Sequence, residues 1–305
     1  MFAAALVAVG GCGADDTKPV NLDDSSREPR NLDKRIEDAE RRLRRLQEGR
    51  SEPRAPRTTV GLRGAEDFLA SLNAKAGVTA GPPGADEPET AGDLTSGPAW
   101  STIKVPIALR VLDRAGGVSA LGDTKRSQIE SAITRSDNGA AARLFASLGS
   151  TAEAAADVQD VLRQAGDDET HVSTEGRGEF SPYGQTDWAL ARQHRFMAAL
   201  AGGCLGDKNN ADYLLSLMGA VTSDTWGLGS AGGPAKWKGG WGPGPEGRYL
   251  VRQMGVIEFG SRKLVVTLAA IPHDGQFATG QRVATAIAEW LRRHARGLAG
   301  PVNRC

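Results

Sequence analysis

The two most strand-like segments of the chain lie next to each other near its C-terminus, and they constrain the fold more than any other feature. Residues 249–259 and 263–271 are rich in apolar and β-branched side chains and flank Gly260-Ser261, a favourable turn pair. A helix is expected directly afterwards, over residues 279–298, because its apolar side chains recur along one stripe. The C-terminal part is therefore predicted to be a β-hairpin covered by a helix.

The preceding part of the chain has a different pattern. A short helix is expected over residues 65–74, followed by short strands at 77–80 and 91–94. Residues 101–217 are mainly helical in pattern, with an irregular interruption over 166–185. Strands at both ends of a helical stretch indicate an α/β (α+β) fold, in which helices flank an antiparallel sheet and an all-helical lobe is added.

The N-terminus differs from the rest of the chain in composition. Residues 1–12 are predicted to be a lipoprotein signal peptide, because small residues precede Cys12 as in a bacterial lipobox. A soluble, merely apolar N-terminus is the alternative. Residues 13–57 form a charged tether, and 58–305 form the globular domain. This organisation predicts an exported protein that a lipid on Cys12 anchors to the outer face of the cell membrane.

Charge and cysteine content exclude several classes of protein. The 37 basic residues balance the 37 acidic ones, so no nucleic-acid partner is expected. Three cysteines are too few for a disulfide scaffold, and no cluster predicts a metal site. In an exported protein Cys204 and Cys305 could form a disulfide, although an unpaired state is equally compatible with the sequence. His194 is expected on a helix surface, and Thr186 is expected to cap a helix.

Three short motifs follow one another along the chain. They are Ser101-Thr-Ile-Lys104, Ser136-Asp-Asn138 and Lys238-Gly-Gly240. This order resembles the S-x-x-K, S-D-N and K-T-G signature of class A β-lactamases and penicillin-binding proteins. The resemblance extends over residues 77–298, since the flanking residues and the final strands and helix also match.

The spacing of the first motif has a physical meaning. Ser101 and Lys104 lie one helical turn apart on one face, so the lysine amine can take the serine proton once burial and nearby cations lower its pKa. Pro106 favours a helix start near Ser101, because its missing N–H does no harm in a first turn. Taken alone, Ser101 could be an ordinary helix cap and Lys104 a solvated side chain.

The resemblance implies roles for the other motif residues. Ser136 would relay a proton, and Asn138 would orient Lys104 or bind the substrate amide. Lys238 would lie on an edge strand and supply positive charge to a substrate carboxylate. Gly240 would allow close approach of the backbone, and the Trp241 N–H would join that of Ser101 in an oxyanion hole.

A structural alternative exists for the second motif. Residues 136–138 could simply cap a helix over 139–148, and both roles are compatible.

The chain also departs from the family pattern. Gly239 stands where the family has a hydroxyl residue that helps to bind the substrate carboxylate. Residues 166–185 contain no E-x-x-L-N motif, and the glutamates there, Glu169, Glu175 and Glu179, have different flanks. Without a placed base, water is not activated against an acyl-enzyme, so acylation is expected to be more efficient than hydrolysis.

These observations predict an exported serine acyl-hydrolase that needs no cofactor. The resemblance implies acylation of Ser101 by D-Ala-D-Ala-like cell-wall peptides or by β-lactams. A non-catalytic cell-envelope binding lipoprotein that keeps the fold is the alternative, and Gly239 and the missing glutamate motif favour it.

Overall fold

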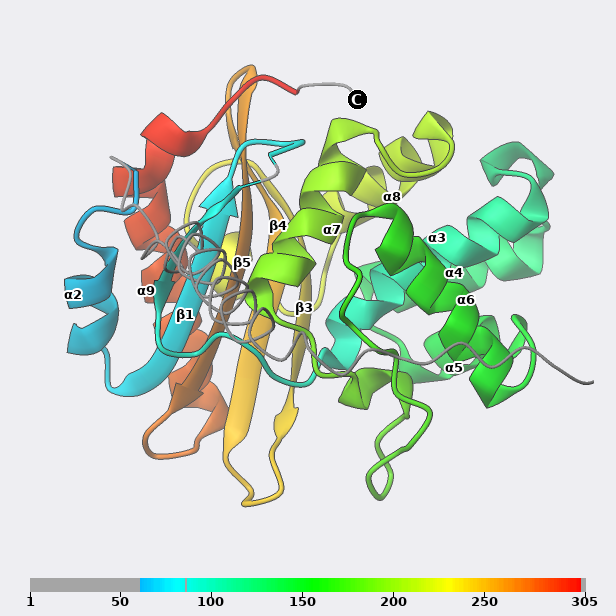
Figure 1. The fold of residues 1–305 in the computed structure, drawn as a ribbon, viewed down its shortest axis with the longest axis horizontal. Helices are drawn as coiled ribbons and strands as arrows, with labels where there is room; N and C mark the ends of the chain where they lie inside the picture. The colour runs from blue at the N-terminus through cyan, green and yellow to red at the C-terminus, as the bar shows by residue number, and fades with distance from the viewer. Residues whose placement is uncertain (1–60, 86, 303–305) are drawn as a thin grey trace, which may run out of the picture. The chain divides into compact units, whose positions relative to one another are not determined.

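A five-stranded antiparallel sheet with the order β2-β1-β5-β4-β3 forms the centre of the fold (Figure 1). The computed structural model describes residues 61–85 and 87–302. The strands are β1 (Ala74–Gly81), β2 (Glu89–Gly92), β3 (Ala235–Pro243), β4 (Tyr249–Phe259) and β5 (Arg262–Pro272). The strands β4 and β5 form the expected hairpin, which confirms the sequence prediction for this region.

Helices cover both faces of this sheet. The α-helices of the described residues are α2 (Ala65–Ser71), α3 (Lys104–Ala115), α4 (Asp123–Thr134), α5 (Asn138–Ala146), α6 (Thr151–Gln164), α7 (Leu190–Gly202), α8 (Lys208–Gly219) and α9 (Phe277–His294). Short 3₁₀ turns are η1 (Trp100–Ile103), η2 (Val118–Ala120), η3 (Tyr183–Gln185), η4 (Gly227–Gly229) and η5 (Ala295–Leu298). Figure 1 shows α2 and α9 on one face, α7 on the other, and α3–α6 with α8 in a lobe beyond α7. The predicted α/β (α+β) class with a helical lobe is confirmed.

Side chains of the central strands alternate between two hydrophobic cores. Val265 belongs to the core shared with the helical lobe, while its neighbours Leu264 and Val266 belong to the core under α9. This alternation follows from the two-residue period of a strand. Because both faces are covered, β4 and β5 show nearly continuous apolar runs.

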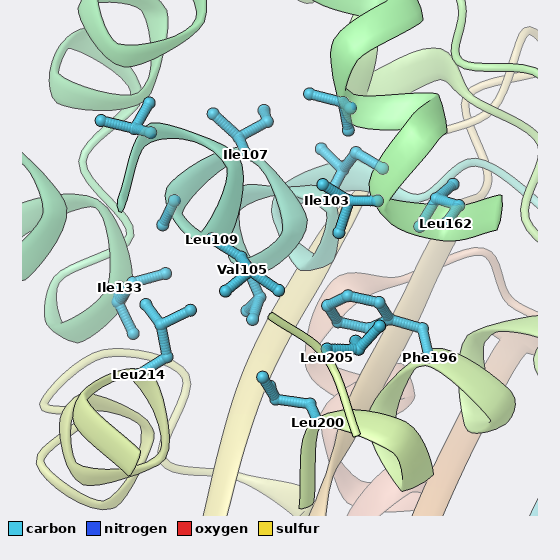
Figure 2. Packing of buried hydrophobic residues seen from close by; sticks show 14 of the residues in the cluster. Ile103, Val105, Ile107, Leu109, Ile133, Leu162, Phe196, Leu200, Leu205 and Leu214 are labelled. Carbon is cyan, nitrogen blue, oxygen red and sulfur yellow. The ribbon is translucent and has the colours of Figure 1, made fainter. Parts of the chain in front are cut away.

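The helical lobe has its own packed interior, and α3 runs through it. Figure 2 shows Val105 and Ile107 of α3 among side chains from other lobe helices and from α7, including Leu162, Leu214 and Phe196. All five residues are at most 1% exposed. Burying one such side chain stabilises a fold by roughly 1.5–3 kcal/mol. The start of α3, which carries the first motif, is therefore held on a rigid base.

Element boundaries differ from the sequence predictions where strand pairing extends an element. The expected helix over 65–74 ends at Ser71, and β1 begins at Ala74 rather than at residue 77. Pairing with β5 accounts for this, since the register runs without interruption from Ala74 opposite Pro272 onward. The strand expected at 91–94 is β2, shifted two residues toward the N-terminus by its pairing with β1.

Two predictions for the region around α7 are wrong. His194 is fully buried instead of lying on the helix surface, and desolvation lowers its pKa to about 4. Its helix is covered on both sides, by the sheet and by the lobe. Thr186 does not cap α7, which begins after Ala189. The Thr186 hydroxyl instead accepts a hydrogen bond from the Ser173 N–H at 3.0 Å, within the irregular segment.

Several predictions fall on residues outside the described ranges. They are the signal peptide over 1–12 with its lipidation at Cys12, the tether over 13–57, and any pairing of Cys305. Cys204 is disulfide-bonded, and both other cysteines of the chain lie outside the described residues, so the Cys204–Cys305 pairing stays a prediction. No helix in the described part is long and apolar enough to cross a membrane. The same residues contain no group of three or more metal-binding side chains.

Candidate active site

The first motif lies on a single turn of 3₁₀ helix that leads into α3. The Lys104 backbone N–H donates to the Ser101 carbonyl, which closes the turn η1. Side chains three residues apart eclipse each other in this geometry, so Ser101 and Lys104 lie along the same edge and line one cleft. Pro106 is the third residue of α3, where a missing N–H is harmless, as the sequence predicts.

Lys104 is almost completely buried and is held by the second motif. Its Nζ donates to the Ser136 carbonyl at 2.6 Å and to Asn138 Oδ1 at 2.7 Å, and it lies 3.4 Å from Ser136 Oγ. Burial, and then the nearby ammonium of Lys238, lower the pKa of Lys104 to about 7. A substantial fraction of Lys104 is therefore neutral at neutral pH and can accept a proton.

The second motif caps a helix and also contacts Lys104. Asp137 caps α5 by accepting from the Ala140 N–H at 2.8 Å, and it also accepts from Ser131 Oγ at 3.0 Å. These hydrogen bonds, led by that of the Ala140 N–H, lower the pKa of Asp137. The capped turn holds Ser136 with a positive φ of 56°, so that its hydroxyl and carbonyl both face Lys104.

Lys238 approaches Ser136 from the sheet. It lies on β3, which is an edge strand, and its side chain is fully buried. Its Nζ donates to Ser136 Oγ at 2.8 Å and to the Gly239 carbonyl at 2.9 Å. Burial lowers the pKa of Lys238 to about 8, with Asp224 opposing this effect. Two lysine amines thus meet at one serine hydroxyl.

The strand β3 runs directly against the turn that carries Ser101. A Cβ atom on Gly240 would lie 2.9 Å from the Ser101 nitrogen and 2.9 Å from the Ala99 oxygen. Only glycine fits this close approach of β3 to the Ser101 turn. The Trp241 side chain is 42% exposed at the cleft rim.

Backbone strain is concentrated around this cleft. The non-glycine residues with positive φ in the described part of the chain are Trp100, Ser136 and Asp224, and all three line the cleft. Such conformations cost about 1–3 kcal/mol each and persist where the surroundings impose them. The Trp100 ring is confined between Gly242, whose Cβ would lie 2.3 Å away, and the Phe180 ring.

Solved structures provide the comparison for this fold, since no family model and no curated protein matches the sequence. A β-lactamase of Sphaerobacter thermophilus superposes with a TM-score of 0.60 at 18% identity, over 79% of this chain and 98% of that chain. The chromosome-encoded β-lactamase of Vibrio parahaemolyticus gives 0.59 at 13% identity, over 77% and 98%. A class A β-lactamase from Mycobacterium abscessus gives 0.59 at 19% identity, over 75% and 98%.

The described part of the chain has a β-lactamase-like fold. Each of these three solved structures is matched over 98% of its own length, so the similarity includes both the sheet and the helical lobe. At these identities the comparison establishes the fold, and the chemistry has to be argued from the side chains of the site.

The cleft of this β-lactamase-like fold has a volume of about 780 Å³ and contains few carboxylates. Among the described residues, Glu179 and Asp224 are the acidic residues that line it. Glu179 is exposed, and Glu169 forms an ion pair with Arg192 instead of entering the cleft. No carboxylate in the described ranges forms a hydrogen bond with Ser101, Lys104 or Ser136.

Tyr183 is a further polar group in this cleft. Its side chain is buried, and desolvation raises the pKa of its phenol. The phenol therefore stays protonated at neutral pH and cannot serve as a base there.

A buried arginine that sequence reasoning missed supports the Ser101 turn from behind. Arg252 of β4 donates to the Gly97 carbonyl at 2.6 Å, the Pro98 carbonyl at 3.0 Å and Gln193 Oε1 at 2.9 Å. The Gln193 amide in turn donates to the Thr102 hydroxyl at 2.8 Å. A charged residue within a mostly apolar, strand-like run was the signal for this network.

Asp224 is the second residue that the sequence did not single out. Its side chain lies against β3, with Oδ2 at 3.8 Å from Lys238 Nζ. The neighbour of Arg252 on β4, Gln253, points to the opposite face and donates to the Asp224 carbonyl at 3.0 Å. No sequence motif marks Asp224, because its position depends on how the segment before η4 crosses the sheet edge.

Proposed function

We propose that this chain is a serine acyl-hydrolase of the β-lactamase and penicillin-binding type, with Ser101 as its nucleophile. The observation that carries the proposal is the convergence of two buried amines, Lys104 and Lys238, on the Ser136 hydroxyl beside the Ser101 turn. Both amines have lowered pKa values, which suits groups that exchange protons near neutral pH. The acyl donors that this family resemblance suggests are cell-wall peptides and β-lactams.

The acylation step follows from these positions. Neutral Lys104 takes the proton of Ser101 Oγ while Oγ bonds to the carbonyl carbon of the acyl donor. We expect the N–H groups of Ser101 and Trp241 to stabilise the resulting oxyanion, and the close approach of Gly240 to the Ser101 nitrogen supports this expectation. The bond from the carbonyl carbon to the leaving atom then breaks, and that atom receives the proton from the Lys104 ammonium through the Ser136 hydroxyl.

Hydrolysis of the acyl-enzyme is expected to be slow. Water needs a positioned base to attack the acyl-enzyme. The described cleft has two carboxylates: Glu179 is exposed, and Asp224 has a side chain that is only 9% exposed and accepts a hydrogen bond from Trp241 Nε1 at 3.0 Å. Loss of a general base costs ~10²–10⁴-fold in rate. The acyl-enzyme should therefore persist about that much longer than one that is attacked by base-activated water.

Intact-mass spectrometry after exposure to a fluorescent penicillin tests the proposal. We expect one stable covalent adduct on the wild type and none on Ser101→Ala. High penicillin concentrations are needed, because Gly239 offers no hydroxyl to the β-lactam carboxylate. Fast multiple turnover of a chromogenic cephalosporin, abolished in Ser101→Ala, would instead make the protein a true β-lactamase. Absence of any adduct, also with a fluorophosphonate probe, would favour the non-catalytic binding lipoprotein.

We also propose that the protein is exported and anchored to the membrane through a lipid on Cys12, with residues 13–57 as the tether. The support is the lipobox-like sequence and the polar stretch that follows it. Metabolic labelling with a lipid precursor should mark the wild type, and Cys12→Ala should be released from membranes. Equal membrane retention of Cys12→Ala would contradict the anchor.

A further inference from the structure

The glycine at position 239, where the family pattern has a hydroxyl residue, lies directly against the side chain of Asp224. A Cβ atom on Gly239 would lie 2.8 Å from Asp224 Cβ and 3.0 Å from both Cγ and Oδ2 of that residue. Real Cβ atoms do not approach so closely, so a side chain at position 239 and the present Asp224 side chain exclude each other. The space next to Lys238 that a hydroxyl residue would occupy is taken by a carboxylate.

Asp224 is held in this place by several contacts. Its backbone has a φ of 50°, and its carbonyl accepts from Trp237 Nε1 and from Gln253 Nε2, both at 3.0 Å. Its Oδ1 accepts from Trp241 Nε1, also at 3.0 Å. The side chain is only 9% exposed. The carboxylate is therefore a fixed part of the strand side of the cleft.

The charge of Asp224 acts on the amines of the site. Oδ2 lies 3.8 Å from Lys238 Nζ and, within the described residues, has no hydrogen-bond donor. Asp224 works against the fall in pKa of both Lys238 and Lys104. The positive charge of Lys238, which an incoming carboxylate would need, is already balanced by an internal carboxylate.

The surroundings offer a carboxylate little compensation. Arg135 also lines the cleft, but it is exposed, so solvent and salt screen its charge. At the same end of the cleft, Trp241 and Tyr249 present aromatic side chains. The Trp241 ring is supported from Phe277, with the ring centroids 4.4 Å apart. Aromatic faces attract neutral or cationic groups rather than anions.

We propose that Asp224 and Gly239 together make this subsite select acyl donors that carry no carboxylate next to the scissile carbonyl. The inference rests on the proposed serine acyl-hydrolase function and specifies its substrate class. Donors whose leaving group is uncharged at this position fit beside Asp224, whereas a carboxylate there meets the fixed negative charge at short range.

Two matched thioesters test this selectivity. They share one acyl group, and their leaving groups are thioglycolate, which carries a carboxylate, and thioglycolamide, which does not. The ratio of the two kcat/KM values is measured for each variant. Effects on Ser101, Lys104 or the oxyanion hole act on both substrates and cancel in this ratio. After division by the ratio of the two uncatalysed hydrolysis rates, which corrects for the different leaving thiols, the wild type should prefer the thioglycolamide ester by roughly tenfold or more, because the carboxylate ester meets the like charge of Asp224.

The variants isolate the contribution of Asp224. Asp224→Asn keeps the shape and tolerates positive φ, and it should lower the preference at least about tenfold. The double variant Asp224→Gly with Gly239→Thr removes the clash and adds a hydroxyl, and it should shift the preference toward the carboxylate ester. Glu179→Gln removes a carboxylate from the rim of the same cleft and is the matched control, with a ratio unchanged within about twofold. Thermal melting of each variant shows whether it is folded.

The outcomes separate this inference from the function on which it rests. A wild type that reacts equally with both thioesters, or a folded Asp224→Asn with an unchanged ratio, overturns the selectivity while Ser101 remains the nucleophile. If the wild type reacts with neither thioester and a fluorophosphonate probe does not label Ser101, the proposed function and the selectivity both fall.

Discussion

The two walls of the cleft differ in how closely they follow the sequence resemblance. The lobe wall, formed by Ser101, Lys104, Ser136 and Asn138, carries the expected residues, with Lys104 in contact with Ser136 and Asn138 and Ser101 lining the same cleft. The strand wall, formed by residues 238–243 with Asp224, carries the expected lysine, but it has Gly239 where the resemblance predicts a hydroxyl residue, and the carboxylate of Asp224 lies 3.8 Å from Lys238 Nζ. Under the proposed function, the nucleophile and its base lie on the lobe wall, whereas Gly239 and Asp224, which we propose to select the substrate, lie on the strand wall.

The largest expected effect concerns the lobe wall. Lys104→Arg should reduce the rate of Ser101 acylation by ~10²–10⁴-fold, because an arginine cannot give up its proton in a protein and so cannot act as the base. Labelling kinetics with the fluorophosphonate probe measure this rate. Lys236→Arg is the matched control, since Lys236 lies on the same strand as Lys238 and forms an ion pair with Glu258. Normal acylation by Lys104→Arg would remove Lys104 as the base.

Arg252 provides a test of whether the acylation rate can change without a change in the substrate preference. Arg252→Met would leave the carbonyls of Pro98 and Trp188 and the Gln193 Oε1 atom without the donor that Arg252 supplies. We expect the free energy of unfolding to fall by more than about 3 kcal/mol, because each unsatisfied buried acceptor costs about 1–3 kcal/mol. Chemical denaturation measures this loss. Arg248→Met, at an exposed position, should change stability by less than about 0.5 kcal/mol.

The same variant also has a kinetic readout. Arg252 holds the segment before the Ser101 turn, so the folded fraction of Arg252→Met should acylate more slowly with both thioesters. The preference between the thioglycolamide and thioglycolate esters should stay the same, since the hydrogen bonds of the Arg252 side chain go to residues 97, 98, 188 and 193 and not to Asp224. A changed preference would contradict the separation of the two walls.

Two adjacent glycines of β3 should respond differently to the same substitution. Gly239→Ala and Gly240→Ala each introduce a Cβ within 3.0 Å of other atoms and should each destabilise the fold by about 1–3 kcal/mol. The neighbour of Gly239 is the Asp224 side chain, whereas Gly240 faces backbone atoms of the Ser101 turn. Asp224→Gly should therefore rescue Gly239→Ala and leave the loss in Gly240→Ala unchanged. Melting temperatures of the double variants measure this coupling.

Much of the fold and of the lobe wall could be predicted from the sequence, because local patterns determine them. The hairpin of β4 and β5 has its turn residues, and Ser101 and Lys104 have their helical spacing. Other features depend on packing between distant segments. His194 was misplaced because the periodicity of a helix does not show that both of its sides are covered. The contact of Asp224 with the site could not be predicted, because Asp224 occupies the space that a side chain at position 239 would fill, and these two positions are distant in the sequence.

The smallest expected effect is an electrostatic influence of the strand wall on the lobe wall. Neutral Lys104 is the reactive form, and its pKa is lowered to about 7. The acylation rate should therefore rise with pH, fall roughly tenfold per unit well below pH 7, and level off above it. Rates of fluorophosphonate labelling between pH 5 and pH 9 measure this profile.

The fall in acylation rate below pH 7, the acid limb of the profile, should depend on Asp224. Its negative charge favours the protonated form of Lys104 and so raises the pKa of Lys104. Asp224→Asn removes this influence, and the pKa of Lys104 should fall further, which moves the acid limb to lower pH and leaves relatively more activity at pH 6. Glu179→Gln, at the exposed rim, should leave the limb in place. An unchanged or raised limb in folded Asp224→Asn would mean that the carboxylate of the strand wall does not act on the nucleophile's base.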